Sequence, residues 1–145
     1  IHLPRGWLHE TLRGKGLVYE VHAFSFAGIE PGYFGVYAGC EPARVDEVRK
    51  LIVEQVTRIF RERIPEADLE AARRICVTAD VLAHQTNAQQ AMRAGVDELL
   101  GQGHDAWKRY APGVLAVTED DLRRVAKKYL THSLTVALTP ESAAR

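Results

Sequence analysis

Two kinds of hydrophobic periodicity occupy separate parts of this chain, and their separation is the strongest constraint on its fold. β-Branched and aromatic residues dominate Leu17–Phe26 and Tyr33–Cys40, and the Gly- and Pro-containing stretch Gly28–Gly32 lies between them. Short strands joined by such a turn predict an antiparallel hairpin. The stretches that follow repeat apolar residues at three- and four-residue spacing, which predicts helices.

The segment before the hairpin predicts a short helix over Arg5–Arg13, because Trp7, Leu8 and Leu12 lie at helical spacing. Gly14 and Gly16 are expected to end this helix, since glycine takes up a left-handed C-terminal cap at little cost. Within the second strand, the alternate positions Gly35 and Gly39 predict that another group approaches the sheet closely there.

The helical region divides at recognisable boundaries. Ala43–Arg63 predicts one long helix with an apolar stripe. The pattern over Glu66–Gly101 is too long for one globular helix, and Thr86–Gln89 has the Thr-x-x-Gln form of a capping box, so two helices are expected. Inward-facing side chains are expected from both helices, including Leu69, Cys76, Ala83, Ala88, Met92, Val96 and Leu99.

The C-terminal third predicts two more helices and a strand. Asp105 is expected to cap a short helix that Pro112 interrupts or kinks. Thr118 is expected to cap a second one, with Leu122, Val125, Ala126, Tyr129 and Leu130 facing inward. Ser133–Pro140 alternates apolar and polar residues and predicts a final strand.

This order of elements predicts an α+β fold, a two-layer sandwich with a mostly antiparallel sheet and helices packed on one face. Three strands are few for this much helix, and the sequence opens at Ile1 instead of Met. We therefore expect the domain to be truncated at its N-terminus. Its exposed sheet edge should then pair with another copy of the chain, as a homo-oligomer, or be covered.

Composition excludes few functions. The 145 residues include 46% apolar and 26% charged residues, with 19 cationic and 19 acidic side chains and zero formal net charge. Such a balance gives no support to binding of nucleic acid or of a membrane surface. No apolar run approaches the roughly 18 residues of a membrane span. The compartment stays open, with bacterial cytoplasm and periplasm both compatible.

Local motifs for catalysis or metal binding are weak. The six histidines form no His-Glu-x-x-His or His-x-x-Glu-His pattern. Asp80 and His84 share a helix face, but such a pair is far more often solvated than part of a metal site. Cys40 and Cys76 lack metal spacing, and we expect both to be buried thiols.

The stretch "LRGKGLVYEV", Leu12–Val21, poses the remaining question. Arg13 is well placed to interact with the dipole at a helix C-terminus, and Tyr19 is well placed to pack on a strand. From the residues alone these are a capping cation and a packing aromatic residue.

A resemblance to a known family changes that interpretation. The stretch Leu8–Gln55, "LHETLRGKGLVYEVHAFSFAGIEPGYFGVYAGCEPARVDEVRKLIVEQ", resembles the C-terminal, non-zinc-binding domain of the insulinase/pitrilysin-type zinc metallopeptidases, especially the mitochondrial-processing-peptidase-like branch. The family has a helix ending in Leu-Arg, a basic Gly-containing turn, Gly-Leu-x-Tyr, and later Phe-Gly-x-Tyr-x-Gly. Val117–Leu130 and "SLTVALTP" resemble the closing helix and strand, so the likeness covers the whole chain.

The resemblance implies that residues 1–145 are a single, partial half-domain that forms part of a peptide chamber. It implies that Arg13 and Tyr19 contact a peptide substrate near the scissile bond. The turn between them is one residue shorter than is usual in the family, so Lys15 is the alternative cation.

The resemblance also implies that zinc and its ligands belong to a partner domain or subunit. The isolated chain is then expected to hold no cofactor and to be inactive alone. The alternative is a structural or assembly relative of the same family that has lost catalysis, as core subunits of a respiratory complex have.

Overall fold

The computed structural model describes residues 6–26 and 32–140, which fall into two compact units. Unit 1 comprises Ile1–Glu62 together with Val125–Arg145, and unit 2 comprises Arg63–Arg124. The helix α5, Glu119–Tyr129, spans the boundary between them. Each unit is described separately below.

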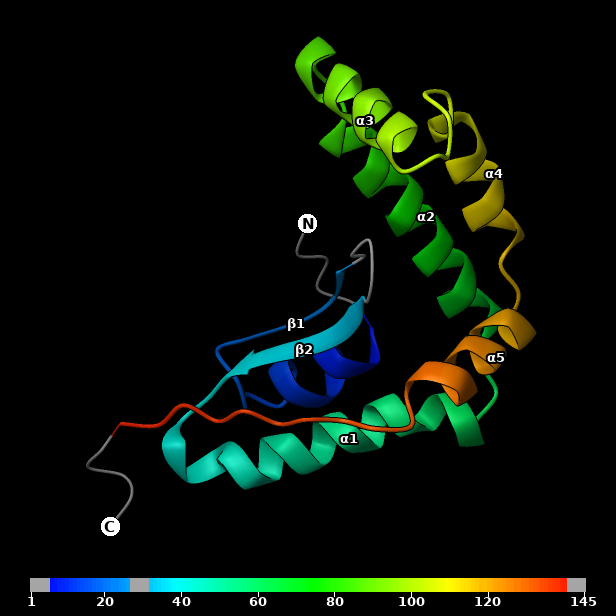
Figure 1. The fold of residues 1–145 in the computed structure, drawn as a ribbon. Coiled ribbons are helices and arrows are strands. Elements are labelled where there is room, and N and C mark those ends of the chain that lie inside the picture. The colour runs from blue at the N-terminus through cyan, green and yellow to red at the C-terminus, as the bar shows by residue number, and fades with distance from the viewer. Residues whose placement is uncertain (1–5, 27–31, 141–145) are drawn as a thin grey trace. The chain divides into compact units, whose positions relative to one another are not determined.

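Unit 1 is built on the expected antiparallel hairpin (Figure 1). Strand β1, Glu20–Phe26, pairs with β2, Tyr33–Gly39, in a register that runs from Glu20 opposite Gly39 to Phe26 opposite Tyr33. β1 begins three residues later than the sequence predicts. The predicted turn falls on Gly28–Gly32, of which the first four residues lie outside the described residues.

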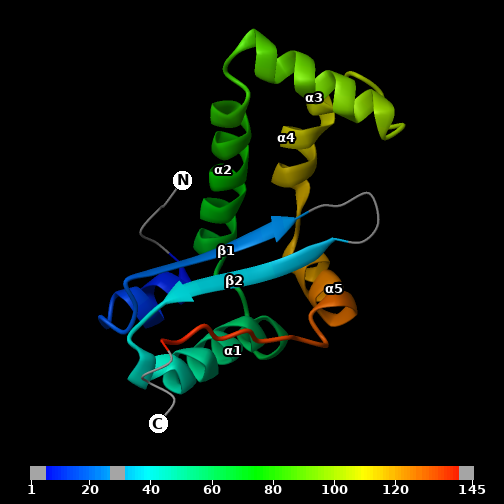
Figure 2. The same ribbon diagram turned by 60° about the vertical axis from the view of Figure 1, so that its left-hand side comes forward.

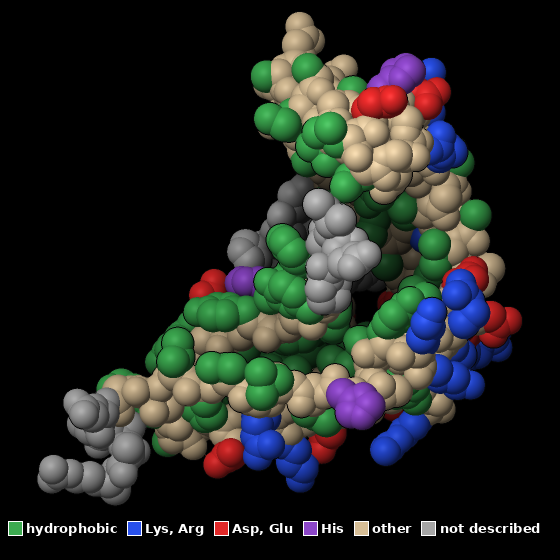
Figure 3. Space-filling view, in the orientation of Figure 1, with side chains coloured by type: hydrophobic (Ala, Val, Ile, Leu, Met, Phe, Trp, Pro, Cys, Tyr) green, Lys and Arg blue, Asp and Glu red, His purple; other side chains and the backbone are tan. Residues whose placement is uncertain are grey.

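The two faces of the hairpin have different surroundings. On one face, Val21 and Ala38 pack against a core made by Leu12, Val18 and Val48. The opposite face carries His22, Phe24, Phe26, Tyr33 and Tyr37, and His22 stacks on Tyr37 with ring centroids 5.0 Å apart. Figure 3 shows hydrophobic side chains gathered over the hairpin.

Gly35 is the close-approach position that the sequence predicts. It lies opposite Phe24, and a Cβ atom on Gly35 would come within 2.5 Å of Phe24 Cζ. Only glycine leaves room for the ring, because carbon atoms in contact prefer separations of about 3.5–4.0 Å.

Helical segments cover one face of the hairpin, in line with the expected α+β class. η1, His9–Arg13, precedes the hairpin, and the short 3₁₀ helix η2, Pro42–Arg44, leads into α1, Val45–Arg61. Val48 on α1 is buried in the core, and Leu51 and Ile52 pack against it. The apolar stripe of the predicted helix therefore faces the sheet.

Unit 2 consists of helices whose first boundary confirms the prediction at Thr86. α2, Glu66–Ala83, ends before a reciprocal capping box in which Thr86 Oγ1 accepts from Gln89 N and Gln89 Oε1 accepts from Thr86 N. α3, Asn87–Leu99, begins there. Figure 2 shows α2 and α4, Trp107–Ala116, side by side, and these two helices contact one another.

Two details of the predicted C-terminal helices need correction. Pro112 does not interrupt α4, which continues through it. Asp105 is not the cap of α4 but pairs with Lys108 and Arg109. α5 is capped as expected, since Thr118 Oγ1 accepts from Asp121 N. Ala126 is buried, but Val125 and Tyr129, also expected inside, are exposed.

The predicted final strand over Ser133–Pro140 is also wrong. The segment does not form a strand, and the sheet of the described part of the chain contains only β1 and β2. A strand requires a neighbouring strand for its backbone hydrogen bonds, and alternation in the sequence cannot supply one. Leu134, Val136 and Leu138 are exposed instead.

Candidate functional site

The segment that carries Arg13 folds as a π-helix. In η1, Gly14 N donates to His9 O, and immediately afterwards Leu17 N donates to Leu12 O, both at 2.9 Å. These bonds join residues five apart, which is the π-helical pattern, and short π-helical turns occur frequently at functional sites. Arg13 is the last residue of this turn.

Gly16 reverses the chain after η1. Its φ of 66° lies in the left-handed region that favours glycine. Gly14, expected to do the same, keeps a right-handed backbone with φ of −61°. Arg44, the residue before α1, donates from Nη1 to Gly16 O at 3.2 Å. This hydrogen bond connects the turn to the start of α1.

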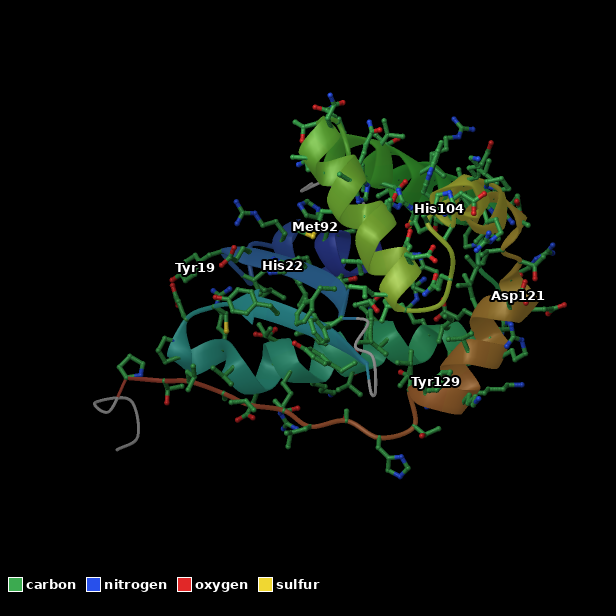
Figure 4. All side chains as sticks on the ribbon, turned by 45° about the horizontal axis from the view of Figure 1, so that its top comes forward. Tyr19, His22, Met92, His104, Asp121 and Tyr129 are labelled. Carbon is green, nitrogen blue, oxygen red and sulfur yellow. The ribbon has the colours of Figure 1, made fainter. Side chains whose placement is uncertain are left out.

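Buried neighbours position both candidate side chains. Leu12 is fully buried and Val18 nearly so, and Arg13 and Tyr19 each follow one of these anchors directly. Tyr19 N donates to Gly39 O at 2.7 Å, which ties its backbone to β2. Figure 4 shows Tyr19 at the start of the hairpin, with His22 further along β1.

Both side chains point away from the core with their hydrogen-bond donors available. Arg13 is exposed, and 63% of Tyr19 is accessible to solvent. Among residues 6–26 and 32–140, neither the Arg13 guanidinium nor the Tyr19 hydroxyl has a hydrogen-bond or ion-pair partner. Lys15 is also exposed on the same turn, so the alternative cation is accessible as well.

The described residues do not fit a zinc site. They contain no group of three or more His, Cys, Asp or Glu side chains placed to hold a metal ion. Structural zinc takes four protein ligands and catalytic zinc three. Nor, among the described helices, is there one long and apolar enough to cross a membrane.

The Asp80–His84 pair belongs to an ion-pair network in unit 2. Asp80 Oδ1 lies 3.4 Å from His84 Nδ1, and its Oδ2 accepts from Arg93 Nη1 at 2.9 Å. Asp97 lies 3.8 Å from Arg93 Nε. The Arg93 guanidinium contacts both carboxylates, so this cluster ties α2 to α3.

Sequence reasoning missed the roles of Arg93 and Tyr110 in this network. Arg93 Cζ lies 5.6 Å from the centre of the Tyr110 ring. Burial raises the pKa of Tyr110, and the nearby Cys76 and Asp80 raise it further while Arg93 opposes them. The i, i+4 spacing of Arg93 and Asp97 was the available signal, but contacts between helices are not encoded in such spacing.

One expectation about unit 2 needs correction, and one feature of unit 2 was not predicted. Cys76 is an exposed free thiol, although its place in the apolar pattern of α2 predicts burial. A groove of about 540 Å³ lies at the junction of α2 and α3, lined by Ala88, Met92 and Val96 together with Arg93 and Asp97.

Comparison with known proteins settles the family. Residues 2–76, just over half of the chain, match the family described as "Peptidase M16 inactive domain". The chain belongs to this family. The expected likeness to a non-zinc-binding, insulinase-type domain is thereby confirmed.

Curated relatives of this M16 domain are named as zinc proteases. It is 26% identical to an uncharacterized zinc protease of Streptomyces coelicolor, over 83% of this chain and 26% of that protein. It is 25% identical to another from Mycobacterium bovis, over 84% of this chain and 28% of the relative. The chain therefore spans about a quarter of the length of the curated relatives it matches.

A solved structure shares the fold of the M16 domain. A conserved protein from Enterococcus faecalis superimposes with a TM-score of 0.70 and 22% sequence identity, over 87% of this chain and 29% of that one. This likeness supports the α+β class.

Proposed function

We propose that this M16 domain is the substrate-contacting, non-zinc-binding part of a zinc metallopeptidase. Residues 1–145 would form one partial, C-terminal half-domain and contribute to the wall of a peptide chamber. Family membership and the names of the curated relatives support this role. The zinc-binding residues would lie on a partner domain or subunit, because the described residues offer no ligand set.

In this proposal Arg13 and Tyr19 bind the peptide. An always-charged guanidinium and a phenol can each donate a hydrogen bond to a peptide carbonyl or to the oxyanion that forms from it. The observation that carries the proposal is that both donors are exposed and unpartnered among the described residues, while buried anchors fix the backbone beside them.

The energetic consequence follows from the role as an oxyanion donor. Removing one such donor costs about 2.7–4 kcal/mol of transition-state stabilisation, or about 100- to 1,000-fold in kcat. A residue that caps a helix or packs on a strand would change stability instead, and would leave turnover per folded molecule intact.

The test uses the complete peptidase, with the zinc-binding partner present and an unstructured peptide as substrate. Arg13→Ala and Tyr19→Phe should each lower kcat about 100-fold or more, with unchanged circular dichroism and unchanged assembly. Lys15→Ala is the matched control on the same turn, and its turnover should not change. This chain alone should neither bind zinc stoichiometrically nor cleave the peptide.

The outcomes separate the alternatives. Loss of turnover in Lys15→Ala but not in Arg13→Ala would assign the contact to Lys15. Normal turnover in all three variants would contradict the substrate-contact role. The complex with the zinc-binding partner could also assemble and yet never cleave the peptide. The chain would then be a structural or assembly relative of the family that has lost catalysis.

A further inference from the structure

The peptide group between Gly16 and Leu17 is held at both ends. Its N–H belongs to Leu17 and donates to Leu12 O at 2.9 Å, and its carbonyl belongs to Gly16 and accepts from Arg44 Nη1 at 3.2 Å. Because a peptide group is a rigid plane, one hydrogen bond at each end fixes the orientation of that plane. The plane lies in the turn that joins η1 to β1.

The composition of this turn gives the bond from Arg44 its importance. Gly14, Lys15 and Gly16 are all exposed, and glycine populates more backbone conformations than any other residue. Among the described residues, no side chain other than that of Arg44 reaches this turn from another element with a hydrogen bond. Without it, the carbonyl end of the plane is released and can rotate about the bonds of Gly16.

The same glycine is bonded to the backbone of Arg13. Gly16 N donates to Arg13 O at 2.9 Å, while Gly16 O accepts from Arg44. On its other side Arg13 follows Leu12, which is fully buried. The backbone of Arg13 is therefore held by the core through Leu12 and by Arg44 through Gly16.

Arg44 itself comes from a well-anchored part of unit 1. It is the residue directly before α1, its N–H donates to Glu41 O at 2.9 Å, and its Nε lies 4.0 Å from Glu41 Oε2. One helical turn later, Val48 is buried in the core that also contains Leu12. The planar guanidinium presents several donors in a fixed geometry, so it can face Glu41 and Gly16 at once.

We propose that Arg44 is a positioning residue, which orients Arg13 through Gly16 for its contact with the peptide. This role rests on the proposed function and goes beyond it, because Arg44 acts on the substrate only through Arg13. A misplacement of about 1 Å can cost about 100-fold in rate. We expect Arg44→Met to lower kcat about 10-fold, less than the loss of Arg13 itself, with little change in KM.

The first test measures kcat and KM of the complete peptidase, with the zinc-binding partner and an unstructured peptide. Arg44→Met keeps the apolar stem but removes the donors, whereas Arg44→Lys restores a charged donor and should recover part of the lost kcat. Arg49→Met is the matched control. Arg49 also pairs with an acidic residue three positions earlier, Asp46, at 3.4 Å, but both residues lie on α1. Its kcat should not change.

The second test separates positioning from a general loss of structure. In the Arg13→Ala background the guanidinium that Arg44 positions is absent, so Arg44→Met should lower kcat by less than about 2-fold there. Residues that act through one another give non-additive effects of this kind. A loss of about 10-fold in both backgrounds would overturn the proposal.

The third test is amide hydrogen exchange, read by mass spectrometry on the same complexes. Fragments that contain Leu17 should exchange faster in Arg44→Met and at the wild-type rate in Arg49→Met, because local opening of the turn exposes the Leu17 amide. Unchanged exchange in Arg44→Met would overturn the proposal, since the bond would then not hold the turn.

The same variants distinguish failure of this proposal from failure of the proposed function. Normal kcat in Arg44→Met, together with a large loss in Arg13→Ala, would overturn the positioning role and leave the substrate contact standing. Normal kcat in Arg13→Ala, Tyr19→Phe and Arg44→Met would overturn both, even if exchange at Leu17 is faster.

Discussion

The contact between Phe24 and Gly35 makes a quantitative prediction about the hairpin. A Cβ atom at Gly35 would lie 2.5 Å from Phe24 Cζ and 3.0 Å from both Cε atoms. Contacting carbon atoms prefer about 3.5–4.0 Å, so in the Gly35→Ala variant the ring must rise by about 1 Å. Because alanine is compatible with the strand backbone, we expect the Phe24 ring to move and the backbone at residue 35 to stay in place.

Two opposing free energies set the size of the effect. Phe24 is 42% exposed, so more than half of the side chain is covered. Uncovering about 40 Å² of apolar surface costs about 1 kcal/mol at about 25 cal/mol per Å². Replacing glycine by alanine in a strand stabilises the folded chain by about 0.5–1 kcal/mol.

We therefore predict that Gly35→Ala changes the free energy of unfolding differently in the presence and in the absence of the Phe24 ring. In the wild-type chain, Gly35→Ala should change the free energy of unfolding by less than about 0.5 kcal/mol, because the two contributions nearly cancel. In the Phe24→Ala background, the same change should stabilise the chain by about 0.5–1 kcal/mol. The coupling free energy between the two sites is then about 1 kcal/mol, typical of residues in contact.

The chain provides a probe for each unit. Trp7 belongs to unit 1, where Arg58 Cζ lies 4.1 Å from the centre of its ring, and Trp107 belongs to unit 2. In a Trp107→Phe background, urea unfolding followed by Trp7 fluorescence therefore reports on the unit that contains the hairpin. All four members of the cycle are measured in this background.

A matched control and a refuting result complete the design. A Cβ atom at Gly39 would meet Glu20 Cγ at an ordinary 3.7 Å, so Gly39→Ala should have the same effect with or without Phe24. Equal effects of Gly35→Ala in the two backgrounds would refute the inference that the ring rests on Gly35.

Two further predictions concern unit 2. Hydrogen bonds from the Thr118 hydroxyl and N–H, and then from Arg124, lower the pKa of Asp121 from 3.8 to about 2. A lowered folded-state pKa contributes stability above the unfolded-state value that is lost as the pH falls through the folded-state value. At neutral pH the wild-type chain should therefore have a higher free energy of unfolding than the Asp121→Asn variant, and the two values should converge near pH 2. A difference in free energy of unfolding that stays constant with pH would contradict this. Arg93→Met should destabilise unit 2 by about 1–3 kcal/mol, because it leaves partly buried Asp80 without its cation; unchanged unfolding by Trp107 fluorescence would contradict this.

Local chemistry made part of the fold predictable. The hairpin followed from two β-type runs around a Gly-Pro stretch, and the boundary between α2 and α3 followed from the Thr86–Gln89 capping box. Each of these features is decided by residues close together in sequence. The same holds for the cap at Thr118, whose partner Asp121 is three residues away.

The errors share a physical cause. Periodicity identifies an apolar face, but it does not say which element covers that face. Cys76, Met92, Leu99 and Val125 all lie on predicted inner faces and are exposed. The prediction of a final strand was wrong for the same reason. Ser133–Thr139 has the pattern of a strand, but no neighbouring strand lies beside it among the described residues.

The candidate site was only partly predictable. Arg13 and Tyr19 were chosen through a family resemblance, and nothing in their spacing alone distinguishes them from a cap and a packing residue. Only the structure shows that each follows a buried anchor, Leu12 or Val18, and lies exposed beside it.

The π-helical turn that ends at Arg13 has a consequence for how such sequences are aligned. A ring closed over five residues holds one residue more than an α-helical ring, so a chain can gain or lose a residue there by changing between the two patterns. The strand that follows would keep its place in the hairpin through such a change. The number of residues that precede the arginine is therefore a poor measure of where the arginine lies in space, and an alignment gap within the turn does not imply a displaced side chain.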